Sequence, residues 1–232
     1  MNEREPSAGA VQALAPAPID LAAWARREHW AYYRERVPCS WSMTVELDVT
    51  GFVAALRASG RKTYIAQLWA LATVVNRHEE FRMAVGDDGS PAIWPVLHPS
   101  FTVFNSRLET FAVLWAEYDP DFALFHERAR SILEEHRSPT GLFPQGEPPA
   151  NAFDVSSLPR TPFSALHIQT PGGVDHLLPI FTLGRHIERD DRTLLPLALQ
   201  VNHAAVDGFH ASRLLGDLQD MFADPGWLGP MG

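Results

Sequence analysis

Residues 202–210, near the C-terminal end, carry side chains that could transfer a proton. Their sequence is NHAAVDGFH, in which His203 stands four residues before Asp207. A histidine titrates close to neutral pH, so His203 could abstract a proton, while Asp207 and the following glycine supply a carboxylate and a tight turn that hold the local backbone. The spacing therefore predicts a general base beside a supporting acid.

Two other interpretations of this segment stay open on the residues alone. His203 could be a core histidine whose neighbour Asp207 caps the next helix, because aspartate is a preferred helix cap. His203, Asp207 and His210 could also bind a metal, but no second cluster of ligands is evident in the sequence. We therefore expect no bound metal.

The segment falls where a strand should end and a helix should begin. Residues 194–201 are strongly apolar and predict a strand, and residues 208–222 have the spacing of an amphipathic helix. Side chains at such a junction reach a cleft at the edge of a sheet, which favours a functional site there.

The rest of the chain alternates between helical and extended patterns. Helical spacing is found over residues 20–37, 50–59, 65–77 and 120–135. Strand patterns are found over residues 43–49, 82–85, 92–96, 101–104, 165–169 and 177–183. We predict one α/β domain with mixed strand order over residues 19–223, between a flexible Ala/Pro-rich arm of residues 1–18 and a tail of residues 224–232.

Composition limits the partners and the location of the protein. Its 28 acidic and 19 basic residues give a formal net charge of −9, which opposes binding to nucleic acid or anionic lipid. The single cysteine, Cys39, cannot form an internal disulfide, and no apolar run approaches the ~18 residues of a membrane span. Residues 1–19 lack the order of a signal peptide, so we expect a cytoplasmic protein with no nucleic-acid or membrane partner.

Several separated segments resemble the chloramphenicol acetyltransferase family. Residues 202–210 are similar to the family's HHxxxDG motif, with Asn202 in the place of the first histidine. Further similar segments follow in the family's order: WARREHW at 24–30, FRMAV at 81–85, FTVF at 101–104, LFPQG at 142–146, SSLP at 156–159 and PIFT at 179–182. The resemblance covers about residues 19–222. It implies a single-domain CoA-dependent acyltransferase fold, with a mixed β-sheet flanked by helices, that assembles as a homotrimer with active sites between subunits.

The resemblance also implies a direct transfer without an acyl-enzyme. His203 would take the proton of an acceptor hydroxyl as that oxygen attacks the thioester of acetyl-CoA. Ser156 would donate to the oxyanion of the tetrahedral intermediate, and Thr182 would position a water there. Asp207 would pair with Arg26 to support the site. Without the family, Ser156, Thr182 and Arg26 indicate a loop hydroxyl, a strand residue and a solvated charge.

The same resemblance assigns residues to substrate binding. The acceptor pocket corresponds to Tyr33, Val37, Cys39, Trp41, Phe111 and Phe143. The CoA contacts correspond to Lys62, Tyr64, Arg185 and His186. Aromatic side chains are more often core than pocket, so each aromatic taken alone indicates packing.

The implied function is acetyl-CoA-dependent O-acetylation of chloramphenicol, which gives antibiotic resistance, with acetyl-CoA as co-substrate and no permanently bound cofactor. The sequence departs from the family at Ser100, Asp154, Arg160, His186 and Asn202. These departures motivate an alternative, an acyltransferase of the same fold that acts on a different alcohol or amine. A non-catalytic protein that binds CoA or a hydrophobic ligand is a third interpretation, against which His203 and Ser156 argue.

Overall fold

A mixed sheet forms the centre of the computed structural model, which describes residues 15–169 and 176–229. Neighbouring strands follow the order β2-β10-β8-β7-β5-β6, and β9 pairs with β10. The β5–β7 and β7–β8 pairs are parallel, and the other pairs are antiparallel. The strands are β2 Ser40–Asp48, β5 His98–Asn105, β6 Thr110–Trp115, β7 Ala152–Leu158, β8 Ile180–Gly184, β9 Ile187–Arg189 and β10 Arg192–Asn202.

A smaller sheet lies beside the main one, with strand order β1-β4-β3. Its strands are β1 Ala17–Pro18, β3 Met83–Val85 and β4 Pro91–Ile93. β1 contains the last two residues of the predicted flexible arm, which pair with Ile93 and Ala92 of β4, so the prediction is wrong for residues 17–18. Residues 1–14 of the predicted arm and residues 230–232 of the predicted tail lie outside the described residues.

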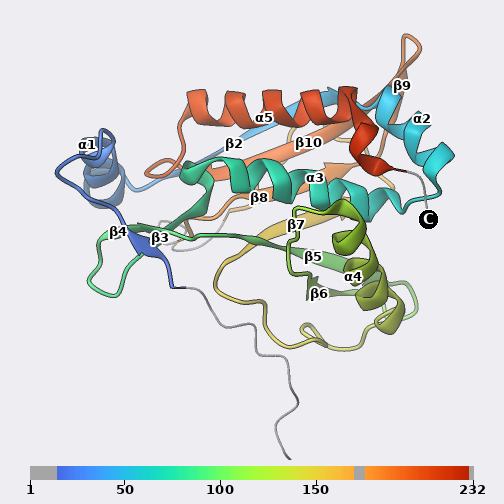
Figure 1. Ribbon diagram of the computed structural model, residues 1–232, viewed down its shortest axis with the longest axis horizontal. Coiled ribbons are helices and arrows are strands. Elements are labelled where there is room, and N and C mark those ends of the chain that lie inside the picture. Colours follow the sequence, from blue (N-terminus) through green and yellow to red (C-terminus); the bar gives the residue numbers. More distant parts are fainter. Residues whose placement is uncertain (1–14, 170–175, 230–232) are drawn as a thin grey trace, which may run out of the picture.

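Helices α3 and α5 run along the main sheet (Figure 1). The longer helices are α2 Thr50–Ser59, α3 Thr63–Arg77, α4 Phe122–Glu135 and α5 Gly208–Ala223. The shorter ones are α1 Arg27–Ala31, a π-helix Tyr32–Arg36 and two 3-10 helices, Glu79–Arg82 and Pro225–Leu228. Within residues 15–169 and 176–229, no helix is both long and apolar enough to cross a membrane.

The two faces of the main sheet differ in chemistry. One row of paired residues, Leu199, Phe181, Val155 and Phe101, is fully buried and belongs to the hydrophobic core together with α3 and α5. The next row, on the opposite face, consists of small residues, namely Thr44, Ala198, Thr182 and Ser156. We call this opposite face the open face of the sheet because it lies away from α3 and α5, although Ala198 and Thr182 on it are buried, and it carries the polar groups of the candidate site.

Most of the predicted elements are confirmed. The strand over 194–201 is β10, the helix over 208–222 is α5, and the helix over 50–59 is α2. Gly60 ends α2 with φ 67°, a left-handed conformation that glycine adopts without strain. The predicted α/β class with a mixed sheet flanked by helices is also confirmed.

Three predictions of elements are wrong or incomplete. The helix expected over 20–37 is helical only over 27–36, because Asp20 makes a turn with Ala22 and the second half is π-helical. Residues 165–169 are not a strand, because their backbone N–H groups donate to side chains on the open face instead of to a strand partner. β1, β6, β7 and β9 were not among the predicted strands.

Candidate active site

His203 lies directly after β10, in a turn that several hydrogen bonds fix. Its backbone N–H donates to the carbonyl oxygen of Cys39 at 3.0 Å. Asn202 supports the turn in two ways: its side-chain oxygen accepts from the N–H of Ala204 at 2.9 Å, and its carbonyl oxygen accepts from the N–H of Val206 at 2.9 Å. The residue in the place of the family's first histidine therefore still holds the backbone that carries His203.

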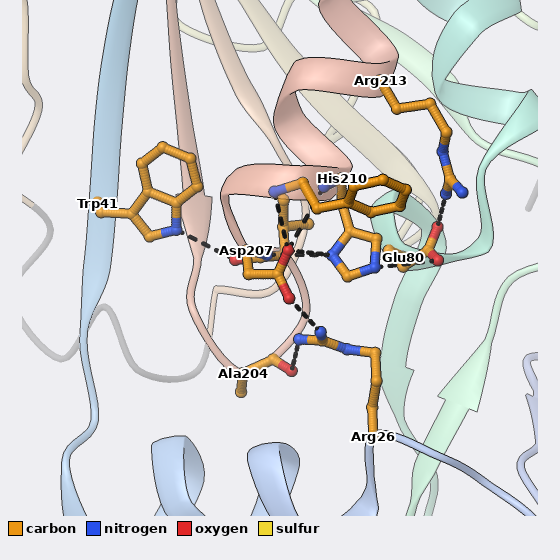
Figure 2. A network of polar contacts seen from close by, with 9 residues as sticks. Arg26, Trp41, Glu80, Ala204, Asp207, His210 and Arg213 are labelled. Atoms are coloured by element: carbon orange, nitrogen blue, oxygen red, sulfur yellow. Dashed lines mark hydrogen bonds and ion pairs between the residues drawn. The ribbon is translucent and has the colours of Figure 1, made fainter.

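Aromatic side chains surround the imidazole of His203. The ring of Tyr33 stacks on it with 3.9 Å between centroids and 7° between planes, and the ring of Trp41 lies 6.2 Å away. The indole N–H of Trp41 donates to the carbonyl oxygen of Val206 at 3.1 Å, which ties that ring to the turn (Figure 2). Nδ1 of His203 is buried and has no hydrogen-bond partner among the described residues. The ring is thus held in one plane with Nδ1 turned inward.

The predicted pair of Arg26 and Asp207 is present. Nη1 of Arg26 lies 2.6 Å from Oδ2 of Asp207, and Nη2 donates to the carbonyl oxygen of Ala204 at 3.3 Å (Figure 2). Burial tends to raise the pKa of Asp207, but the hydrogen bond from Arg26 and the nearby positive charges outweigh it, so that the pKa lies below its usual value. Asp207 is therefore charged at neutral pH and joins the chain before α1 to the turn of His203.

The polar network continues from Asp207 through His210 to Glu80 and Arg213. Asp207 is the N-cap of α5 and makes a reciprocal capping box with His210. Nε2 of His210 lies 3.4 Å from Glu80, which also accepts a hydrogen bond from Arg213 at 2.8 Å (Figure 2). His210 is thus a capping residue. Among the described residues, no group of three or more His, Cys, Asp or Glu side chains could hold a metal ion.

Ser156 and Thr182 face each other across β7 and β8. Their hydroxyl oxygens lie 2.8 Å apart on the open face. Thr182 is paired with Ala198 on β10, and the strand advances at about 3.3 Å per residue from there to His203, which puts His203 about 16 Å further along. Within one chain, the two predicted oxyanion-side residues are therefore remote from the predicted base.

The six residues predicted to bind the acceptor fall into two groups. Tyr33, Cys39 and Trp41 contact or adjoin His203, and Val37 follows the π-helix that contains Tyr33. Phe111, however, lies on β6, four strands from β10 in the sheet order, which corresponds to about 19 Å. Phe143 lies in the loop beside β6, where the neighbouring carbonyl oxygen of residue 142 accepts from the N–H of residue 113. One chain does not bring the six residues into one pocket.

The residues predicted to bind CoA lie at the far end of the sheet. Lys62 and Tyr64 stand at the start of α3, and Arg185 and His186 join β8 to β9. Both the start of α3 and β9 are at the end of the sheet away from α1 (Figure 1). Burial lowers the pKa of His186. The hydroxyl of Tyr64 donates to the carbonyl oxygen of Thr102 at 3.3 Å, and burial raises its pKa, so this hydroxyl is used within the fold.

Two of the positions at which the sequence is expected to depart from the family meet on the open face near Ser156. Ser100 on β5 is paired with Asp154 on β7, and Asp154 stands two residues before Ser156. Nε2 of His176 lies 3.9 Å from Oδ2 of Asp154. Burial raises the pKa of Asp154, which the charge of His176 and the hydroxyl of Ser100 partly offset. A carboxyl group with perturbed ionisation thus lies beside the predicted oxyanion donor.

Comparison with known proteins agrees with the residues that carry the resemblance. The family model described as chloramphenicol acetyltransferase matches residues 15–219. A chloramphenicol acetyltransferase from Streptomyces acrimycini is 62% identical over 213 residues, which cover 92% of this chain and 97% of that protein. This chain belongs to the chloramphenicol acetyltransferase family. Another relative, from Vibrio anguillarum, is 40% identical over 203 residues, covering 88% of this chain and 92% of that protein.

The fold agrees with a solved member of the chloramphenicol acetyltransferase family. That structure superposes with a TM-score of 0.78 at 22% sequence identity, and the match covers 89% of this chain and 99% of that chain. The protein is therefore an acetyltransferase enzyme with the predicted fold, and acetyl-CoA is the co-substrate that such an enzyme requires. The non-catalytic interpretation is set aside.

Proposed function

We propose that the protein transfers an acetyl group from acetyl-CoA to a hydroxyl group of chloramphenicol, and so gives resistance to that antibiotic. The observation that carries the proposal is the fixed imidazole of His203, stacked on Tyr33 with Nδ1 buried, in a chain of this family. A histidine whose orientation is set by its neighbours can act as a general base at neutral pH.

Each step of the transfer has a residue to serve it. With Nδ1 buried, Nε2 of His203 takes the proton of the acceptor hydroxyl, and the acceptor oxygen forms a bond to the thioester carbonyl carbon. The hydroxyl of Ser156 donates to the resulting oxyanion, and Thr182, 2.8 Å from it, orients Ser156 and positions a water at the same intermediate. The carbon–sulfur bond then breaks, and the CoA sulfur receives the proton from His203. No covalent acyl-enzyme forms.

The site is assembled from two copies of the chain in a homotrimer. This proposal is supported by the ~16 Å between the row of Ser156 and Thr182 and the position of His203, which is too far for one intermediate to contact both. It is also supported by aromatic side chains left exposed near the edge of the sheet: Phe104 is 60% exposed and Phe111 53%. The His203 end of one copy would pack against the open face of the next.

The two substrates would approach this shared site from different sides. Lys62 and Arg185 offer positive charge for the phosphates of CoA, with Tyr64 and His186 beside them. The acceptor would lie between Tyr33, Val37, Cys39 and Trp41 of one copy and Phe111 and Phe143 of the other. Apolar walls with a few polar anchors suit an aromatic alcohol such as chloramphenicol.

We infer the domain bounds, the cellular location and the excluded partners of the enzyme from the same sequence. The family domain would occupy residues 19–223, preceded by an Ala/Pro-rich segment whose residues 17–18 pair with β4, and followed by a short tail. The formal net charge of −9 supports an enzyme that binds neither nucleic acid nor anionic membranes, and the single cysteine is in keeping with a cytoplasmic location.

A second function has one observation in its favour. Asp154, whose pKa burial raises, lies with Ser100 beside the predicted oxyanion donor, and such a carboxyl group could select a different alcohol or an amine. The deciding experiment measures thiol release from acetyl-CoA with chloramphenicol and with a panel of other alcohols and amines. Chloramphenicol-dependent release that His203→Ala abolishes supports the first function. Release only with other acceptors supports the second.

A further inference from the structure

The side chains of Asp207 and His210 form a reciprocal capping box at the first turn of α5. Oδ1 of Asp207 accepts from the backbone N–H groups of Phe209 and His210 at 3.0 and 3.4 Å. In return, the backbone N–H of Asp207 donates to Nδ1 of His210 at 3.2 Å (Figure 2). His210 is only 8% exposed, so water cannot easily replace this acceptor.

The direction of that hydrogen bond fixes the protonation of His210. Because Nδ1 accepts from the N–H of Asp207, it carries no proton, and the single proton of the neutral ring is on Nε2. Nε2 lies 3.4 Å from Oε1 of Glu80, and Oε2 of Glu80 accepts from Arg213 at 2.8 Å. Glu80 belongs to the 3-10 helix after α3, so a residue far away in the sequence favours the Nε2-protonated tautomer of His210 over the Nδ1-protonated one.

We propose that His210 is a positioning residue for acetyl transfer: as a neutral ring with its proton on Nε2, the tautomer that Glu80 favours, it holds Asp207 in the orientation that binds Arg26 and fixes the turn of His203. The inference rests on the proposed function, in which His203 is the base. Asp207 then serves both sides at once, because Oδ1 caps α5 while Oδ2 binds Arg26. His210 never touches the reacting atoms and acts through Asp207.

A second proton on His210, at Nδ1, would remove the hydrogen bond that Nδ1 accepts from the backbone N–H of Asp207. Nδ1 of His210 lies only 2.9 Å from Oδ1 of Asp207, so a protonated Nδ1 would donate to the carboxylate and could no longer accept from the backbone. The groups that face the ring have opposing effects on the pKa of His210. Burial together with Arg26 and Arg213 lowers its pKa, whereas Glu80 and Asp207 raise it, and the net pKa lies below the usual value. The cap is therefore intact at neutral pH and is lost as the solution becomes acid.

Two variants distinguish the capping role of His210 from a role in packing alone. His210→Leu removes the acceptor, and kcat should fall about tenfold while the KM of each substrate changes less than about twofold. His210→Gln keeps an acceptor, because glutamine at this position completes a capping box, and should keep kcat within about threefold of the wild type. Its kcat should also lack one acid-side ionisation that the wild type shows.

A matched control is available on the same helix. Asp217 on α5 lies 2.9 Å from Nε2 of His78, which follows α3, and this histidine–carboxylate pair does not include Asp207. Asp217→Asn should leave kcat and its pH profile unchanged. Equal losses of kcat in His210→Leu and His210→Gln, or a wild-type kcat in His210→Leu, would overturn the inference.

Spectra of protein with ¹⁵N-labelled histidine give a test that needs no turnover. His210 should show the neutral form protonated at Nε2, and Glu80→Gln, which removes a negative charge, should move its titration to lower pH. A proton on Nδ1 at neutral pH, or an unmoved titration in Glu80→Gln, would contradict the inference. If the wild type fails to acetylate chloramphenicol, the proposed function fails while these spectra still test the cap.

Discussion

The ring of Tyr33 lies parallel to the imidazole of His203, with 3.9 Å between the two centroids and 7° between the planes. Tyr33 belongs to the π-helix after α1, whereas His203 follows β10, so the stack joins two segments that are far apart in the sequence. Short π-helical segments frequently occur at functional sites. The stack limits the imidazole to one plane, which is what a general base requires.

The effect of a Tyr33 substitution on kcat should therefore depend on whether the aromatic ring that stacks on His203 is kept, and not on the hydroxyl group of Tyr33. Tyr33→Phe keeps the stacked face and should retain most of the activity, whereas Tyr33→Ala should lower kcat about tenfold, since a favourable aromatic pair is worth about 0.5–1.5 kcal/mol. Steady-state kinetics with both substrates measures the effect. A large loss of kcat in Tyr33→Phe would show that the hydroxyl of Tyr33, and not its stacked ring, matters.

Ser156→Ala should reduce kcat far more than it changes the KM of either substrate. In the proposed mechanism the hydroxyl of Ser156 donates to an oxyanion that exists only along the reaction path, and loss of such a donor costs about a hundredfold or more in kcat. Thr182→Val serves as a comparison, because it removes only the partner hydroxyl 2.8 Å away and should cost less. An effect of Ser156→Ala confined to KM would make Ser156 a substrate-binding residue instead.

The pair of Arg26 and Asp207 should behave as a unit in a double-mutant cycle. Arg26→Ala and Asp207→Asn should each lower stability, and the double variant should lose less than the sum, with a coupling of about 1 kcal/mol. The pKa of Asp207 is lowered in the folded protein, so its contribution is present above the unfolded pKa and is lost as the pH falls through the folded pKa. Denaturation at a series of acid pH values, with Asp207→Asn as control, measures it; strict additivity would contradict the coupling.

The acceptor pocket should respond to the residues in which this chain departs from its family. Asp154→Asn and Ser100→Gln, separately and together, should lower the KM for chloramphenicol without raising kcat, because each mismatched polar group costs about 1–3 kcal/mol. Burial raises the pKa of Asp154, so the wild-type KM should fall as acid neutralises this carboxyl group. The KM of Asp154→Asn should lack that acid-side decrease. An identical pH dependence of KM in both proteins would exclude Asp154 from acceptor binding.

The sequence predicted the elements whose patterns are local. The apolar run before His203 and the amphipathic helix after Asp207 are β10 and α5, since burial on one face or both determines them. Residues 165–169 have a strand-like composition, but they lie across the open face, held by the side chains of Thr44 and Gln200, which no local pattern encodes.

The candidate site likewise contains residues that the sequence predicted and residues that it did not. The motif around His203 and its supporting pair with Arg26 followed from the resemblance, and the pair is present at 2.6 Å. Glu80 and Arg213 were missed, because the contact of Glu80 with His210 depends on how the 3-10 helix after α3 packs against α5. The sequence also offered no measure of the ~16 Å between His203 and the row of Ser156, which strand register alone provides.

The central claim, that one chain supplies the base and another the oxyanion donor, is tested most directly by mixing two inactive variants. His203→Ala and Ser156→Ala are co-expressed, and mixed oligomers are assayed for chloramphenicol-dependent thiol release from acetyl-CoA. Random mixing should restore about a quarter of the sites, because each restored site joins an intact His203 from one chain to an intact Ser156 from its neighbour. Mixed oligomers that form but show no more activity than either variant alone would contradict the account.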